Sequence, residues 1–141
     1  MALTHTQTQI TWSSASTKSV TSATEVESDV MTLDATCVAL SIQLSTDTTG
    51  TPSAGDTAVF RVKWSTGDVL ADSGDDYDTS EYATWIATLD TLSTNTPGED
   101  PARTTVPVPS LATKFKLTVV CANAATHTMT IAARMDEQRF A

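Results

Sequence analysis

The chain has 141 residues and a formal charge of −9 at pH 7, a length that suits one domain with one hydrophobic core. This acidic balance repels phosphate backbones, so we expect no nucleic-acid partner. The 28 threonines and 14 serines favour strands over helices, because threonine is stiff at its first side-chain torsion.

No stretch of the sequence reaches the ~18 consecutive apolar residues of a membrane-spanning helix. The first thirty residues also lack the basic start and apolar run that are typical of an export signal. We therefore expect no membrane partner and no classical export.

The N-terminal segment, residues 1–16, is polar and poor in core residues. It is predicted to be an extended arm that becomes ordered only against a neighbouring subunit, with residues 17–141 forming the folded domain. Ile10 and Trp12 in this arm, and Phe140 at the other end of the chain, have no obvious strand partner within the chain. These three are candidate interaction residues, and deletion of the arm should leave the domain folded.

Alternating apolar and polar residues predict strands along the rest of the chain. The clearest pattern lies in residues 35–45, where four apolar residues share one face: Val38, Leu40, Ile42 and Leu44. AVFRVKW and YATWIATL follow the same period, although the second could alternatively form a short helix. QTQITW, SVTS and SDVMTL are predicted to be shorter strands.

Near the C-terminus, KFKLTVVCA and TMTIAARM each carry one apolar face, and the short polar segment NAATH connects them. The pair is predicted to form a hairpin. With about seven or eight short strands separated by turn residues, the sequence predicts an all-β fold, a single antiparallel β-sandwich of the jelly-roll or immunoglobulin-like kind.

Three connections exceed ordinary hairpin length: residues 46–57, 70–82 and 93–110. The second is acidic, with five carboxylates: Asp72, Asp75, Asp76, Asp78 and Glu81. It does not match the EF-hand loop, because Glu81 occupies the position that requires glycine. We interpret it as a solvated loop in which aspartates cap turns. An irregular calcium site built from Asp75, Asp76 and Asp78 is the alternative, and no other cofactor is expected.

Cys37 and Cys121 fall in strand-like segments, where a free cysteine behaves as a small apolar residue. A disulfide between two sheets is the alternative. Zinc is disfavoured, because no CxxC spacing occurs and His5 and His127 lie far apart. No GxSxG motif or other catalytic signature is present, so we expect no catalytic residues and no enzymatic activity.

The aromatic residues divide into two groups. Trp64 shares its face with Phe60 and Val62 and is predicted to lie in the core. Trp12 and Tyr77 have less patterned surroundings, so they are candidates for an exposed contact surface.

Over residues 20–139, four segments carry a resemblance to a known group of proteins: VTSATEVESDV…LDAT, GTPSAGDTAVFRVKWS, YDTSEYATWIATLDT and KFKLTVVCANAATHTMTIAARMDE. The chain resembles small β-sandwich proteins encoded among the virion genes of tailed bacteriophages. The shared motifs are features of turns and strands, so the resemblance implies a virion structural part and transfers no active-site residue.

The resemblance implies a capsid decoration or cement protein that binds and stabilises the head shell. Its expected partners are the major capsid protein or other virion subunits and further copies of itself as a homo-oligomer, and its expected location is the virion, assembled in the host cytoplasm. Two alternatives remain: a component of the tail or of a head fibre, and a carbohydrate-binding β-sandwich module that presents an exposed aromatic platform.

Overall fold

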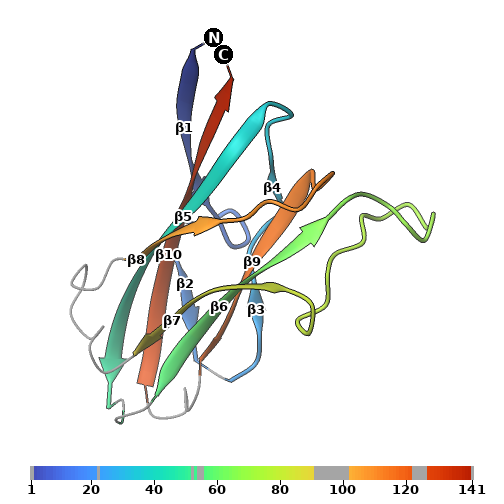
Figure 1. Ribbon diagram of the computed structural model, residues 1–141. Coiled ribbons are helices and arrows are strands. Elements are labelled where there is room, and N and C mark those ends of the chain that lie inside the picture. The colour runs from blue at the N-terminus through green and yellow to red at the C-terminus, as the bar shows by residue number, and fades with distance from the viewer. Residues whose placement is uncertain are drawn as a thin grey trace.

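The computed structural model describes residues 2–21, 23–51, 53, 56–90, 102–121 and 127–140. In these residues the chain forms ten strands and no helix, and the strands make two antiparallel sheets that pack face to face (Figure 1). The strands are β1 (Leu3–Ile10), β2 (Lys18–Val20), β3 (Val26–Glu27), β4 (Met31–Thr32), β5 (Cys37–Gly50), β6 (Thr57–Ser65), β7 (Thr84–Asp90), β8 (Ala102–Val106), β9 (Lys114–Cys121) and β10 (His127–Phe140). The predicted β-sandwich is confirmed, with more strands than the seven or eight expected.

The first sheet has the order β1-β10-β5-β8, and β2 also pairs with β10. Because β10 is long, β1 and β2 pair with successive parts of it: β1 with residues 133–140 and β2 with residues 129–131. The second sheet has the order β3-β9-β6-β7, and β4 also pairs with β9. In both sheets, therefore, one long strand is bordered by two shorter segments that follow one another along the chain.

The core lies between the two sheets. Most of the apolar residues that the alternating pattern assigns to the inner faces are buried there. Leu40, Ile42 and Leu44 of β5 are at most 1% exposed, and Trp64 of β6 is 3% exposed. Val38 departs from the predicted pattern, since 49% of it is exposed. The register between β10 and β5 shifts between Gln138 and Arg139, so the simple alternation does not extend to that end of β5.

A second register shift explains the face pattern of YATWIATL. Residues 84–89 of this segment lie in strand β7, so the helical alternative is wrong. The pairing of β6 with β7 shifts between Phe60 and Arg61, which leaves Ile86 as an extra residue in β7. As a result Ile86 and Ala87 are both buried, whereas the preceding Trp85 is 59% exposed.

The predicted hairpin of KFKLTVVCA and TMTIAARM is wrong, although both segments are strands. They form β9 and β10, which lie in different sheets. Each strand has one apolar face, and alternation alone cannot decide whether two such strands pair side by side or face each other across a core. Here they face each other.

The extended arm predicted for residues 1–16 is also corrected. β1 pairs with β10 along its whole length, from Leu3 opposite Phe140 to Ile10 opposite Ala133. Ile10 is fully buried and Trp12 is 3% exposed. The 14-residue β10 gives this polar segment a partner inside the domain, and its alternation of Thr with His and Gln suits a strand.

A tight turn after β1 directs Trp12 into the core. Ser13 and Ser14 have positive φ values of 50° and 68°. The carboxylate of Asp29 accepts hydrogen bonds from both of their backbone N–H groups, each at 2.8 Å, and from the hydroxyl of Thr11 at 2.6 Å. The turn is therefore held by a residue of the segment between β3 and β4.

Two features project from the sandwich. Figure 1 shows β1 and the adjacent ends of β5 and β10 extending beyond the second sheet, at the end of the molecule where the two chain termini lie. The connection between β6 and β7, residues 66–83, projects from the side of the sandwich and then returns (Figure 1). We call it the β6–β7 loop.

Candidate interaction surfaces

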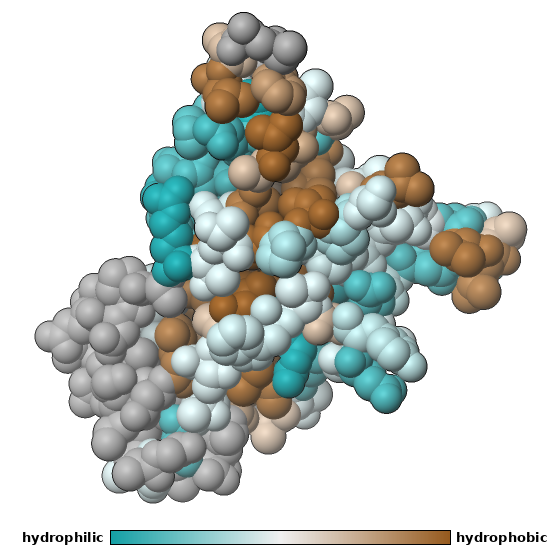
Figure 2. All heavy atoms as spheres, viewed as in Figure 1, coloured by the Kyte–Doolittle hydropathy of each residue, from teal (hydrophilic) through white to brown (hydrophobic). Residues whose placement is uncertain are grey.

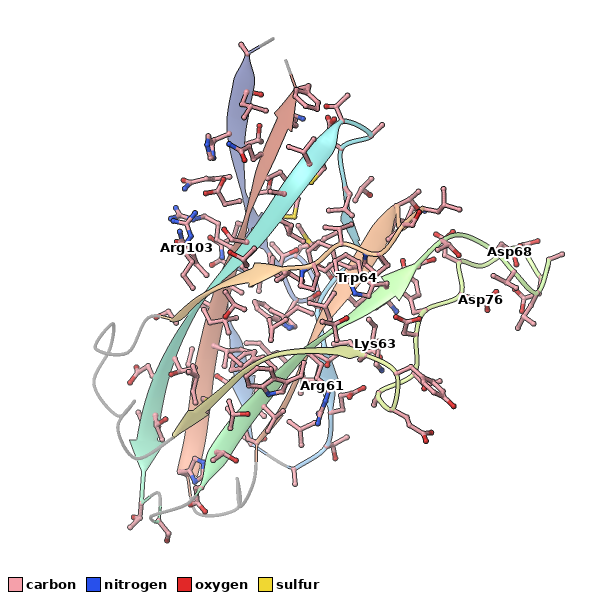
Figure 3. All side chains as sticks on the ribbon, in the orientation of Figure 1. Arg61, Lys63, Trp64, Asp68, Asp76 and Arg103 are labelled. Atoms are coloured by element: carbon pink, nitrogen blue, oxygen red, sulfur yellow. The ribbon has the colours of Figure 1, made fainter. Side chains whose placement is uncertain are left out.

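The β6–β7 loop is built by carboxylates that accept backbone hydrogen bonds. Asp76 accepts from the N–H groups of Val69 at 2.7 Å and Leu70 at 2.9 Å. Asp68 accepts in the same way from the amides four and five residues later, at 3.2 and 3.0 Å. Figure 3 shows both aspartates on the projecting part of the loop. Together with an isolated bridge between Gly67 and Asp76, these four bonds fix the course of the loop outside the two sheets.

The tip of this loop presents two apolar side chains to solvent. Val69 is 75% exposed and Leu70 is 71% exposed, and Figure 2 shows a hydrophobic group at the tip of the projecting loop. Ala71 and Ser73, which follow, have positive φ values of 55° and 78°, a conformation uncommon for residues other than glycine. The loop therefore holds an exposed apolar pair in a defined conformation.

A shallow depression of ≈ 420 Å³ lies between the loop and the sandwich. Trp64 and Pro109 line it from the sandwich side, and Val69, Leu70 and Tyr77 line it from the loop. The apolar tip thus borders a hollow into which a partner's side chain could fit.

Asp75, Asp76 and Asp78, the carboxylates of the alternative calcium site, each have a different partner. Asp75 forms an ion pair with Lys114 at 2.5 Å. Asp76 accepts hydrogen bonds from the N–H groups of Val69 and Leu70. Asp78 accepts from the N–H of Trp64 at 3.3 Å. Aspartates of this segment therefore cap turns, as predicted, and within the described ranges no group of three His, Cys, Asp or Glu residues is arranged to hold a metal ion.

Tyr77 is half-buried at the base of the loop. The ammonium of Lys116 lies 4.6 Å from the centre of its ring, a cation–π contact. Its hydroxyl is buried and has no hydrogen-bond partner among the described residues. Burial raises the pKa of Tyr77, and the nearby Asp75 carboxylate raises it further. Tyr77 therefore packs the loop against the second sheet and is not a freely exposed contact residue.

A buried lysine ties the loop to another part of the chain. The Nζ of Lys63, on β6, lies 2.5 Å from the carboxylate of Glu25 and 2.6 Å from that of Glu27, and Figure 3 marks its position. Glu25 also accepts a hydrogen bond from the hydroxyl of Ser80 in the β6–β7 loop at 2.6 Å. This network joins β6, the segment around β3 and the returning part of the loop.

The charges in this network stabilise one another. Burial by itself lowers the pKa of Lys63, but the hydrogen bonds and charges of Glu25 and Glu27 outweigh it, so the pKa is raised. The hydrogen bond from Lys63 lowers the pKa of Glu27; burial opposes this shift, and Lys116 adds to it.

On the outer face of the first sheet, beside β1, a second polar cluster surrounds Asp136. Its side chain is only 8% exposed and accepts from Arg103 at 2.7 Å, while the Nδ1 of His5 lies 3.4 Å away. Arg103 also donates to the hydroxyl of Ser41, and Figure 3 shows it over this face. The guanidinium of Arg103 therefore balances the negative charge of the Asp136 carboxylate.

Of the four interaction residues predicted from the sequence, the structure leaves one well exposed. Phe140 is 42% exposed, beside its strand partner Leu3, which is 49% exposed. Tyr77 is half-buried, and Ile10 and Trp12 belong to the core. The structure thus separates these residues and does not gather them into one surface.

The exposed pair Val69 and Leu70 was not among the predicted residues. A signal was present, because these two adjacent apolar residues stand alone in the polar stretch STGDVLADSGDD. Alternation of apolar and polar residues cannot reveal such a pair, because the pair belongs to no strand. Tyr82 and Trp85, 74% and 59% exposed, were also assigned to strand faces without regard to exposure.

The search for relatives gives no family for this chain. No protein-family model matches it, and no curated protein matches its sequence. In the part of the chain that the structure describes, no helix is long and apolar enough to cross a membrane.

Proposed function

We propose that this chain is a structural subunit of a tailed-phage virion, a head decoration or cement protein that binds the assembled shell through its β6–β7 loop. The observation that carries the proposal is the exposed pair Val69 and Leu70, held at the tip of the loop by Asp68 and Asp76. The resemblance of residues 20–139 to β-sandwich virion proteins supports the same function.

The composition of the loop indicates the kind of partner. Residues 66–83 contain six carboxylates and no lysine or arginine, and they surround an apolar tip. The complementary surface is an apolar pocket on a shell subunit with basic residues around its rim. The partner is the major capsid protein or another virion subunit.

The ordered loop also lowers the cost of binding. Side chains and backbone that are already fixed lose little conformational entropy when they dock. A subunit that binds only the assembled shell stabilises it by mass action, because it lowers the population of opened states. This activity requires no catalytic group, and the chain would be incorporated during assembly in the host cytoplasm.

The test is an add-back experiment with particles that lack this protein. The double substitution Val69→Ser and Leu70→Ser should reduce particle occupancy at least tenfold without lowering the unfolding midpoint, because both side chains are exposed. Val30→Ser serves as the control, since Val30 is 46% exposed and lies outside the loop. Equal occupancy of the double variant and the control would refute the proposed contact.

A carbohydrate-binding module is the second candidate, and one observation favours it. Tyr82, at the end of the β6–β7 loop, and Trp85, near the start of β7, are exposed aromatic residues three positions apart, and aromatic faces stack on sugar rings. Glycan binding that is lost in Trp85→Ala would support this function. A tail or head-fibre location would instead appear as a few copies at one vertex.

A further inference from the structure

β1 is an unusual edge strand. It forms the border of the first sheet, and in the described residues no strand pairs with its other side; Figure 1 shows it at the margin of the molecule. Alternate N–H and C=O groups of an edge strand point away from the sheet and remain free to pair. β1 is eight residues long, and every second residue directs its N–H and C=O groups away from β10.

The other edges of the sandwich are short or protected. β2, β3 and β4 have only two or three residues each. β7 and β8 border different sheets but lie against each other, since the hydroxyl of Thr104 donates to the carbonyl of Ile86 at 3.2 Å. β8 also carries the charged Arg103. Short length, coverage and charge are the usual means by which proteins prevent edge pairing, and β1 has none of them.

The electrostatics of β1 also permit a second copy to approach, despite the net charge of −9. The sequence of β1, LTHTQTQI, contains no lysine, arginine or carboxylate. The acidic residues of the adjacent strand β10 are satisfied within the chain: Asp136 by Arg103, and Glu137 by the backbone N–H of Asp34 at 2.8 Å. Like-charge repulsion is therefore low at this edge.

We propose that β1 pairs antiparallel with β1 of a second copy of this chain, so that the two first sheets become one continuous sheet. The occupant is a second copy because two identical uncharged strands of this kind are complementary to each other about a twofold axis. This inference does not depend on the proposed function and concerns a different surface from the β6–β7 loop.

The side-chain pattern restricts the register. A twofold axis perpendicular to the sheet keeps the inner faces of both copies on one side. Opposite residues must then share a face, so the residue nearest the axis lies opposite its own copy. The axis therefore lies between the two copies of Thr6 or between the two copies of Gln7, the central residues of β1. In the first case Thr4 lies opposite Thr8 of the second copy, and His5 lies opposite its Gln7, which gives favourable cross-strand pairs of threonines and polar residues.

The decisive test is a pair of proline variants, Thr6→Pro and Gln7→Pro, studied by sedimentation velocity over a range of concentrations. The wild type should form a dimer reversibly. The N–H groups of adjacent residues point to opposite sides of a strand, so one proline removes a bond to β10 and the other removes a bond to the second copy. The variant whose proline removes the bond to the second copy should stay folded and dimerise at least tenfold more weakly. The alanine substitution at that same position, which keeps the N–H, should dimerise like the wild type.

Hydrogen exchange of the wild type provides a test that no folding defect can obscure. The amides of β1 that do not face β10 should gain protection as the protein concentration rises. A wild type that stays monomeric, or a dimer that both proline variants retain, would overturn the proposal. Exchange of those amides that is independent of concentration would overturn it as well.

Discussion

The Sγ atom of Cys121 lies 3.7 Å from the Sδ atom of Met129, and this contact joins β9 to β10 across the core. The two residues are close in sequence, yet they belong to different sheets. Cys121 and Met129 are both fully buried, so the contact lies where the two apolar faces meet.

Thiol chemistry gives the first prediction. Both cysteines are free, so the alternative disulfide is not formed. Burial raises the pKa of Cys121 to about 11. Burial and the Glu137 carboxylate also raise the pKa of the half-buried Cys37. Ellman's reagent should label Cys37 slowly and should not label Cys121 in the folded protein. The variant Cys37→Ser isolates Cys121, and rapid labelling of this variant under native conditions would contradict the structure.

The placement of β1 in the domain gives the second prediction. Ile10→Ala should lower the free energy of unfolding by about 2–5 kcal/mol, because it leaves a cavity at a fully buried position. Leu3→Ala, at the exposed end of the same strand, should cost less than about 0.5 kcal/mol. Urea unfolding measures both. An equally small effect of the two substitutions would favour the loose arm over the strand.

The Lys63 network gives the third prediction. Lys63→Met should destabilise the protein by about 1–2 kcal/mol, because it removes hydrogen bonds to both Glu25 and Glu27. Lys116→Met is the matched control, since Lys116 is more exposed and lies 3.3 Å from Glu27; it should cost at most about 1 kcal/mol. Equal losses in chemical denaturation would show that the buried lysine has no special role.

Acid stability gives the fourth prediction. The pKa of Glu27 is lowered from its ordinary value of 4.5, so the folded state binds fewer protons at this group than the unfolded state. The resulting stabilisation is present above pH 4.5 and is lost as the pH falls through the lower pKa of the folded state. Glu27→Gln should therefore lose less stability than the wild type between neutral pH and pH values below 4.5. Parallel pH profiles of unfolding free energy would disagree with this assignment.

The conformation of the β6–β7 loop gives the fifth prediction. Asp76→Ala removes the acceptor for the amides of Val69 and Leu70, so these amides should exchange with solvent at least tenfold faster. Asp72→Ala is the control, because among the described residues the Asp72 carboxylate accepts a single long bond, from Gly74 at 3.3 Å. Unchanged exchange at both amides in Asp76→Ala would mean that the loop is ordered by other contacts.

The alternation in the sequence was sufficient to predict the apolar faces of the central strands, because the buried apolar residues of β5, β6 and β9 repeat at a period of two. It could not predict which strands pair. The face of a strand is a local property, whereas its partner depends on contacts between distant segments. The assignment of β9 and β10 to a hairpin was wrong for this reason.

Short or polar strands are also hard to predict from the sequence, because they carry few apolar residues. β8, with the sequence ARTTV, lies in a proline-rich stretch and carries little apolar signal. β1 is mostly threonine and glutamine. Its apolar contacts with the core come from Ile10 at its end and from Trp12 in the turn that follows. The apolar tip of the β6–β7 loop has no periodicity at all. The hydrogen bonds that the Asp68 and Asp76 carboxylates accept show that this tip has a fixed conformation.

We propose that this β-sandwich acts by adhesion to a virion shell. The most direct test of this proposal is an image reconstruction of intact particles produced from the genome that encodes the chain, with this protein located in the density. We predict many copies spread over the head, each with its β6–β7 loop against a shell subunit. Purified, infectious particles that do not contain the protein would contradict the claim.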